Sequence, residues 1–438
     1  MTRASARPLW RGRALAMLGI VLCAFSLRSA VASLSPVIEL IGADFTVSPT
    51  VLGIIGTIPP VCFALFGLIT PMLEQRLGIE RVAVIALLTI TAGIVSRGLV
   101  GDSVGLLAAT ALTFAGVGMG NILLPPLVKK YFPDRIGLMM TLYTTAMSFS
   151  TFLPPMVAVP VAEATDWRFS LAMWGAFALA GAIPWMLMLL RPADDSIRHS
   201  TPQEAPRTAP VTRPSSGGDE PALTGPIATA PATRRIFGRL RRIPLVWALA
   251  FTFGTSSTMA YVTFAWMPVI LVDLAGVSAA TAGFLLSLFA TVSLPASLLV
   301  PVLVVRFQAT RPLFAFGSIG GLIGLIGLLL APLPGLLPLW MVLFGLVGVL
   351  FPLSLVLISI RSRTPEGAVV LSSFVQSVGY TFAAVFPLLI GVLHDLTHAW
   401  TVPLLIVAGV LVVTFPAGMI AGRRVTVEDE WERRHGTW

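Results

Sequence analysis

Long apolar stretches separated by short polar ones run along the whole chain. Twelve of them come close to or exceed the roughly 20 apolar residues that a helix needs to cross a membrane. They lack the period-two alternation of barrel strands, and backbone polar groups cannot stay unpaired in lipid, so we predict transmembrane helices. The predicted spans are 14–40, 50–73, 82–100, 104–128, 136–162, 169–190, 244–272, 279–304, 312–333, 335–360, 368–393 and 400–421.

The composition agrees with a protein that is solvated by lipid. Of the 438 residues, 56% are hydrophobic and only 11% are charged, with a mean hydropathy of +0.90. Soluble proteins carry charge on about a quarter of their residues. The net charge of +9 does not indicate nucleic-acid binding, because the basic residues lie in short clusters between apolar runs. The two cysteines, Cys23 and Cys62, are too few for a cysteine metal site, and we expect neither metal nor cofactor.

The basic residues predict the orientation in the membrane. If the N-terminus is cytoplasmic, 26 of the 29 Lys and Arg residues fall on the inner side and only Arg168 lies in an outer loop. The other two, Arg28 and Arg97, lie within predicted spans. Since positive residues accumulate on the cytoplasmic side of membrane proteins, both termini are predicted to be cytoplasmic.

The longest polar segment divides the chain. Residues 191–243 are rich in Pro, Thr, Ser and Arg, which is typical of a flexible linker without a fold of its own. The expected parts are a cytoplasmic N-terminus (1–13), an N-terminal six-helix bundle (14–190), the cytoplasmic linker (191–243), a C-terminal six-helix bundle (244–421) and a cytoplasmic tail (422–438).

Short motifs recur in the two halves with an offset of 230 residues. One pair is Val47-Ser48 with Gly53 and Val277-Ser278 with Gly283; the other is Pro71, Arg76, Arg81 and Pro301, Arg306, Arg311. The repeats predict an all-α integral membrane protein made of two six-helix pseudo-repeats. Transporters are commonly built in this way, with the substrate site near the midplane between the repeats. We expect the four arginines of the second motif to act in gating loops.

Arg28 is the strongest candidate for a substrate site. It lies about 22 Å along a helix that starts near Arg13, at a rise of 1.5 Å per residue. An arginine at that depth costs at least roughly 2.5–3.5 kcal/mol. It could bind an anion through its planar fork of donors, or it could be a structural residue bonded to carbonyls of a neighbouring helix. Arg97 lies nearer the outer surface, where it could contact substrate, act in a gate or extend outward along its stem.

No Asp or Glu lies deep in any predicted span. Buried arginines without buried acids favour an anionic or electron-rich polar substrate, and in a proton-coupled carrier the proton would then travel with that substrate. Further candidates for polar contacts share helical faces in their spans: Asn121, Ser257, Tyr261, Gln376 and Tyr380. Small hydroxyl residues are also ordinary packing contacts between membrane helices, so Ser257 alone indicates little.

Several motifs resemble those of one transporter family. They are Leu27-Arg28 with Ser33 and Pro36, Arg97, Asn121 to Pro125 with Lys129, Trp167-Arg168, Tyr261, Trp266 to Pro268, Phe351 to Leu353, Arg361, Arg363, and Gln376 to Tyr380. Together with the 6+6 plan they resemble the cyanate permease and 2-nitroimidazole transporter family (CynX/NimT) of the major facilitator superfamily. The resemblance covers nearly everything outside the linker and tails.

The resemblance implies a secondary active transporter and not an enzyme, located as a multi-pass protein in the cytoplasmic (inner) membrane of a bacterium. The expected substrate is a small anionic or electron-rich polar solute, such as a cyanate-like or small organic anion, moved by alternating access. The alternative is export of drug-like heteroaromatic compounds such as nitroimidazoles. Ser29 and Ser256 depart from the family pattern, so the substrate can differ from cyanate. We expect a monomer in the bilayer and no nucleic-acid partner.

Overall fold

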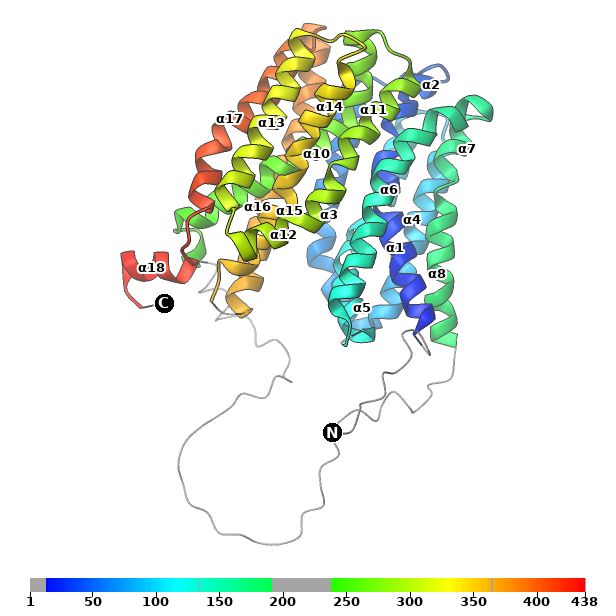
Figure 1. Ribbon diagram of the computed structural model, residues 1–438. Coiled ribbons are helices and arrows are strands. Elements are labelled where there is room, and N and C mark those ends of the chain that lie inside the picture. The colour runs from blue at the N-terminus through cyan, green and yellow to red at the C-terminus, as the bar shows by residue number, and fades with distance from the viewer. Residues whose placement is uncertain (1–12, 133, 191–237, 364, 438) are drawn as a thin grey trace, which may run out of the picture.

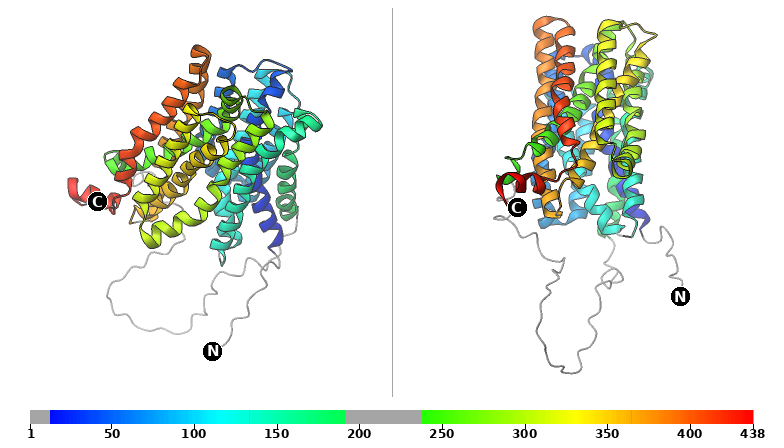
Figure 2. Two further views of the ribbon diagram at one scale, coloured as in Figure 1. Left: turned by 45° about the horizontal axis from the view of Figure 1, so that its top comes forward. Right: turned by 60° about the vertical axis from the view of Figure 1, so that its left-hand side comes forward.

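The computed structural model describes residues 13–132, 134–190, 238–363 and 365–437. In this part of the chain every regular element is helical, and the helices form two bundles side by side (Figures 1 and 2). Twelve helical stretches are long and apolar enough to cross a membrane, one for each predicted span. The predicted all-α architecture is therefore confirmed. The predicted N-terminal segment 1–13 and linker 191–243 lie almost entirely outside the described residues.

The N-terminal bundle begins with an interrupted helix. The prediction of one helix over 14–40 misses a break near Pro36, whose nitrogen has no hydrogen to donate and where a short 3-10 turn intervenes. The helices are α1 (Ala14–Ala32), η1 (Ser35–Val37), α2 (Ile38–Gly42), α3 (Pro49–Leu77), α4 (Ile79–Arg97), α5 (Ser103–Tyr131), α6 (Ile136–Ala164), α7 (Trp167–Ala172) and α8 (Gly175–Leu190).

The C-terminal bundle repeats this plan with breaks of its own. The span predicted over 279–304 divides near Val292, because Pro295 has no N–H for the carbonyl of Thr291. The helices are α10 (Pro244–Ala275), α11 (Ala279–Thr291), α12 (Ser293–Phe307), α13 (Thr310–Leu330), α14 (Leu337–Gly345), η3 (Leu346–Val349), α15 (Leu350–Ile360), α16 (Pro365–Thr397), α17 (Thr401–Ala421) and α18 (Val427–His435).

The predicted repeat is visible in how the helices begin. Ser48 and Ser278 cap α3 and α11, each with an extended backbone and a side chain that accepts a hydrogen bond from the amide three residues on. A second symmetric pair consists of indole hydrogen bonds to carboxylates. Trp167 donates to Asp44 at 3.0 Å in the N-terminal half, and Trp400 donates to Asp273 at 2.8 Å in the C-terminal half. Each half therefore has a tryptophan–aspartate hydrogen bond at the corresponding place.

A short amphipathic helix, α18, lies across the end of the C-terminal bundle (Figure 1). Its first turn is acidic, and it starts in a capping box formed by Thr426 and Asp429. Glu430 accepts a hydrogen bond from the first turn of α10, and Arg363 forms ion pairs with acids of α18. This helix ties the start of α10 to the loop between α15 and α16.

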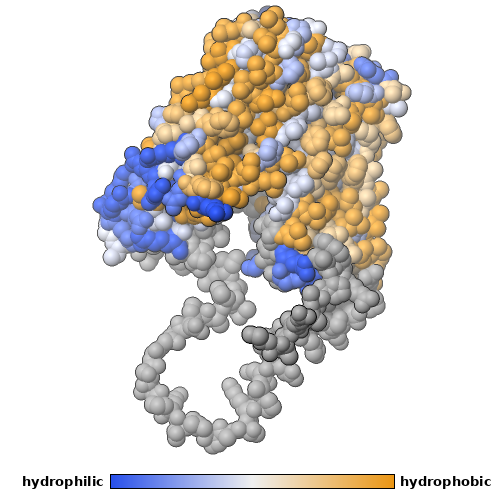
Figure 3. All heavy atoms as spheres, in the orientation of Figure 1, coloured by the Kyte–Doolittle hydropathy of each residue, from blue (hydrophilic) through white to orange (hydrophobic). Residues whose placement is uncertain are grey.

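The surface carries the pattern of a membrane protein. Figure 3 shows apolar residues over the middle of the visible face and polar residues near α18 and at the ends of the bundles. We call the end where α1 begins and α17 ends the arginine-rich end; it also holds Arg76 and Arg306, in the last turns of α3 and α12. The end where α3 and α11 begin is the opposite end.

The two halves touch closely toward the opposite end. A Cβ added at Gly53 of α3 would lie 2.8 Å from the carbonyl oxygen of Pro387 in α16, and one at Gly283 of α11 would clash with that of Pro155 in α6. These contacts are related by the repeat, and so are two hydrogen bonds beside them. They run from Thr57 to the carbonyl of Ala384 at 2.9 Å and from Ser287 to that of Phe152 at 2.7 Å. The halves are closed against each other at this level.

Substituting Gly283 by alanine tests this closure. The added methyl meets backbone that cannot yield, and overpacking of this kind costs about 1–3 kcal/mol. We expect a population shift of roughly 5- to 150-fold toward opening at this end. Distances between spin labels at Thr165 and Ala399, measured by electron paramagnetic resonance in a cysteine-free background, should lengthen.

Gly409→Ala in α17 is the matched control, because a Cβ there has nothing within 4 Å. It should leave the distances as in the parent. If Gly283→Ala also leaves them unchanged, the contact with Pro155 does not hold the two halves together.

Candidate functional site: the central cavity

A cavity of about 720 Å³ lies between the two bundles. Its walls come from α1, α3, α5 and α6 of one half and from α10, α11, α12, η3, α15 and α16 of the other. It extends toward the arginine-rich end, where Pro125, Pro301 and Leu355 line it, and Figure 3 shows the surface hollowed between the halves there. The structure brings six of the predicted site residues to its wall: Arg28, Asn121, Ser257, Tyr261, Gln376 and Tyr380.

Arg28 carries the charge of the cavity. Among the described residues that line it, Arg28 is the one with a formal charge, and none is acidic. Its guanidinium lies within hydrogen-bonding reach of the Tyr261 hydroxyl and close enough to Tyr380 for electrostatic contact. Since both tyrosines come from the C-terminal half, Arg28 of the N-terminal half faces polar groups of the partner bundle across the cavity.

The course of α1 explains how Arg28 reaches the cavity. Ser26, Leu27 and Ser29 are fully buried, whereas Arg28 between them is only partly buried. Ser26 returns its hydroxyl to the carbonyl of Leu22 at 2.8 Å, and Ser150 of α6 donates to the carbonyl of Phe25. Small residues thus let α1 pack closely against its own bundle and leave Arg28 on the face toward the cavity.

Aromatic rings surround the charged group. The ring of Phe63 from α3 lies 6.3 Å from that of Tyr261 and 5.7 Å from that of Tyr380, and the two tyrosine rings are 6.4 Å apart. Phe253 contacts Tyr380 edge-on at 5.0 Å. These separations are typical of interacting aromatic pairs. The cluster gives the cavity flat apolar walls beside a fixed cation.

Some polar groups in the cavity wall already have hydrogen-bond partners within the protein, and others do not. The amide of Gln376 donates to Ser372 at 2.7 Å, and the hydroxyls of Ser148 and Thr151 return to carbonyls of their own helix. The buried hydroxyl of Ser257 has no hydrogen-bond partner. A buried polar group without a partner is costly, so Ser257 is a site where a ligand could supply the missing hydrogen bond.

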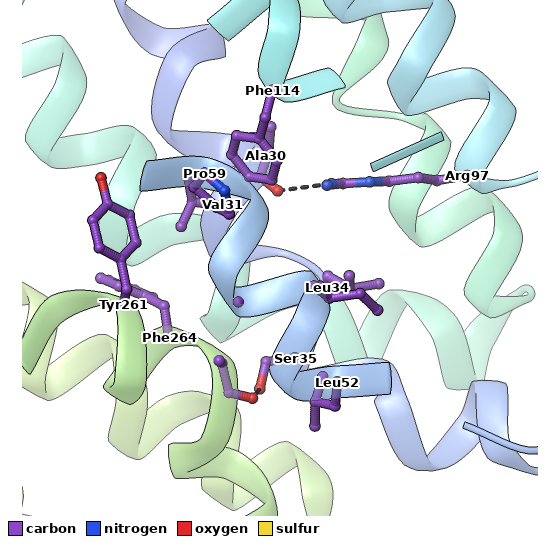
Figure 4. Close-up of a pocket in the computed structure, with 13 residues that line it drawn as sticks. Ala30, Val31, Leu34, Ser35, Leu52, Pro59, Arg97, Phe114, Tyr261 and Phe264 are labelled. Atoms are coloured by element: carbon purple, nitrogen blue, oxygen red, sulfur yellow. Dashed lines mark hydrogen bonds between the residues drawn. The ribbon is translucent and has the colours of Figure 1, made fainter. Parts of the chain in front are cut away.

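Arg97 lies outside this cavity and does not extend to the outer surface. It is 1% exposed, donates to the carbonyl of Ala30 at 2.8 Å and to the hydroxyl of Thr110 at 3.2 Å, and lines a small separate pocket (Figure 4). The expectation that its side chain extends toward the outer surface is wrong, because α1 and α5 supply hydrogen-bond acceptors close to α4. The loop-motif arginines Arg76, Arg81, Arg306 and Arg311 are all exposed and do not line the cavity.

Sequence reasoning missed most of the apolar lining and part of the polar lining. Phe63, Met147, Phe264, Phe289 and Phe351 line the cavity, but an apolar residue in a membrane helix gives no signal that separates a cavity face from a lipid face. Ser293 and Ser297 also line it. Their i, i+4 spacing beside Pro301 was a readable signal of a shared helical face.

Two six-helix bundles that close together toward one end, around a central cavity with a few polar groups in its apolar wall, define a solute transporter. Comparison with known families gives the more particular result: residues 20–383 match the Major Facilitator Superfamily. The chain is 34% identical over 420 residues to the uncharacterized transporter YycB of Bacillus subtilis (strain 168), covering 95% of both chains.

Two relatives from Escherichia coli (strain K12) narrow the placement. The 2-nitroimidazole transporter is 30% identical over 417 residues, covering 94% of this chain and 96% of its own. The cyanate transport protein CynX is 26% identical over 405 residues, covering 91% and 96%. The chain belongs to the major facilitator superfamily, in the branch that holds these two transporters.

A solved structure of the same fold supports the architecture. A bacterial homologue of the human lysosomal transporter Spinster superposes with a TM-score of 0.70 at 15% identity, covering 97% of this chain and 99% of that one. With twelve apolar helices and bacterial transporter relatives, this chain is a multi-pass protein of the inner membrane and not an enzyme.

Two serine substitutions distinguish a hydroxyl that lacks a hydrogen-bond partner from one that has a partner. Ser257→Ala removes a group without a partner and should change the melting temperature little, while it weakens ligand binding. Ser35→Ala removes a buried hydrogen bond of 2.8 Å to the carbonyl of Ala265, which is worth about 1 kcal/mol, and should lower the melting temperature. Differential scanning fluorimetry with and without ligand measures both effects. A lower melting temperature for Ser257→Ala with unchanged ligand binding would show that this hydroxyl is a packing group.

Proposed function

We propose that the protein is a secondary active transporter for a small anionic or electron-rich polar solute. The observation that carries this proposal is Arg28, the one charged group in the wall of a central cavity whose described lining contains no acid. A guanidinium presents a planar fork of donors that matches a carboxylate or a similar anion. Because the described lining holds no carboxylate, a cationic solute would be repelled by Arg28 and would meet no opposite charge in the wall.

The surroundings of Arg28 favour a small planar anion. The rings of Phe63, Tyr261 and Tyr380 offer faces and edges against which a flat ligand can lie. Ser257, Asn121 and Gln376 line the same space and would complete the polar contacts at the far side of the ligand. A cyanate-like ion or a small organic carboxylate satisfies both requirements.

The mechanism we propose is alternating access. By the distribution of Lys and Arg, the termini and the arginine-rich end would face the cytoplasm. The cavity would then open inward, and the contacts at Gly53 and Gly283 would form the outer closure. The two halves would rock about the site, so that it opens first to one side of the membrane and then to the other. One chain would suffice, and in a proton-coupled carrier the proton would travel with the solute. The inner closure would involve the exposed loop-motif residues Arg76, Arg81, Arg306 and Arg311.

A second function, export of neutral heteroaromatic compounds, also has an observation in its favour. A relative named a 2-nitroimidazole transporter is 30% identical over nearly the whole chain, and the aromatic cluster would accept a flat ring without charge. The two functions differ in what they require of Arg28. An anion needs the positive charge, whereas a neutral ring needs the aromatic faces.

Arg28→Gln is expected to weaken anion binding strongly. A hydrogen bond to a charged group is worth about 1.5–3 kcal/mol, which corresponds to a loss of roughly 10- to 150-fold in affinity. Ligand-induced thermal stabilisation of purified protein measures this with cyanate, short carboxylates and nitroimidazoles. Arg28→Lys keeps the charge but loses the planar fork, and should bind anions with intermediate affinity.

Arg423→Gln, which removes an exposed positive charge after α17, is the control for net charge and should bind like wild type. If nitroimidazoles stabilise wild type and Arg28→Gln equally and no anion stabilises either, the anion proposal fails. The heteroaromatic exporter then takes its place.

A further inference from the structure

Arg97 is sealed in the N-terminal half with part of its guanidinium unused. Its side chain is 1% exposed, its Nη1 donates to the Ala30 carbonyl and its Nε to the Thr110 hydroxyl, and its Cζ lies 5.3 Å from the centre of the Phe114 ring. The remaining nitrogen, Nη2, is buried and has no hydrogen-bond partner.

All of these contacts are with neutral groups. Among the described residues no carboxylate forms an ion pair with Arg97, although other arginines of the chain have such pairs. An isolated buried charge is among the most costly features in a protein, and arginine does not lose its proton readily. An anion from outside the chain would therefore compensate the charge of Arg97.

A small pocket lies beside this group. It measures about 30 Å³ and is lined by α1, η1, α3, α4, α5 and α10, with Arg97 and Phe114 on one side and Tyr261 and Phe264 on the other (Figure 4). The volume suits one water molecule or one monatomic ion, since a site needs at least roughly 10–15 Å³ to hold a water. No organic substrate would fit in it.

The polarity of the wall favours an ion over water. A buried water needs two to four polar partners. Apart from Arg97, the polar side chains of this wall are Ser35, whose hydroxyl donates to the Ala265 carbonyl, and Tyr261, whose hydroxyl lies toward Arg28. A halide needs few directed hydrogen bonds and gains most from a nearby uncompensated cation.

We propose that this pocket binds a monovalent inorganic anion of chloride size, held by Arg97. The site is distinct from the central cavity, with which it shares only Val31, Tyr261 and Phe264 as lining residues. It does not depend on which solute the cavity carries.

The site also has a consequence for the conformational cycle. Its wall combines Leu52 and Gly56 of α3 with Ala265 of α10, which belong to different halves. The pocket is complete only while the halves are closed at the opposite end. A bound anion therefore stabilises that closed form, and chloride acts on the conformational equilibrium.

The test measures melting temperature against chloride or bromide concentration, with methanesulfonate replacing the halide at constant ionic strength. Wild type and Arg28→Gln should both show a saturable rise, because the cavity arginine is not involved. Arg97→Gln should show none, and Arg97→Lys, which keeps a charge, should retain a weaker one. A halide effect that is lost in Arg28→Gln and kept in Arg97→Gln would assign the ion to the cavity and overturn the proposal.

Crystals of wild type grown in bromide provide a second readout that does not need a folded variant. An anomalous peak in the pocket lined by Arg97 is the expected result. No peak there, together with no halide effect on wild type, would show that the pocket holds water or nothing, and the proposal would be wrong.

Discussion

The close approach of backbones between the two halves is the constraint on which the rest of the structure depends. Gly53 and Gly283 present no side chain, so α3 and α11 can lie directly against carbonyls of α16 and α6. Because lipid gives no hydrophobic drive for helix association, such contacts and their flanking hydrogen bonds must hold the halves together. They gather toward one end, and the cavity exists because the bundles diverge from there.

This interface is also suited to switching. It consists of van der Waals contacts and a few hydrogen bonds, among them those that the amide and the hydroxyl of Thr50 donate to the Asp395 carboxylate. A hydrogen bond between neutral groups contributes on the order of 1 kcal/mol, and one to a carboxylate about 1.5–3 kcal/mol. Hydrogen bonds that secure each half internally, such as Trp167 to Asp44, lie within one bundle and need not break when the halves move. The hydrogen bonds from Trp167 and then Arg168 hold the pKa of Asp44 below its usual range, so Asp44 stays ionised and keeps these contacts at neutral pH.

The sequence allowed the spans, the repeat and the polar side of the cavity to be predicted, because the cost of polar groups in lipid leaves a strong pattern. A charged side chain within a span, such as that of Arg28, is costly in lipid and therefore faces the bundle interior or a cavity. The helix breaks at Pro36 and Pro295 had proline signals, but those signals do not say whether a helix kinks or ends. From the sequence we predict only a cytoplasmic tail over 422–438, whereas the structure forms α18 there, with the capping pair Thr426 and Asp429 at its start.

The two buried arginines show what sequence could not resolve. Both stand in apolar helices, and depth alone made Arg97 look like a group that could extend outward. The difference arises from neighbours far along the chain: Ala30 and Thr110 draw Arg97 inward, whereas small serines in α1 leave Arg28 beside the cavity. The scaffold repeats between the halves, but α10 supplies hydroxyls and no cation where α1 supplies Arg28. The two halves therefore share a scaffold, and the wall of the cavity between them is asymmetric in charge.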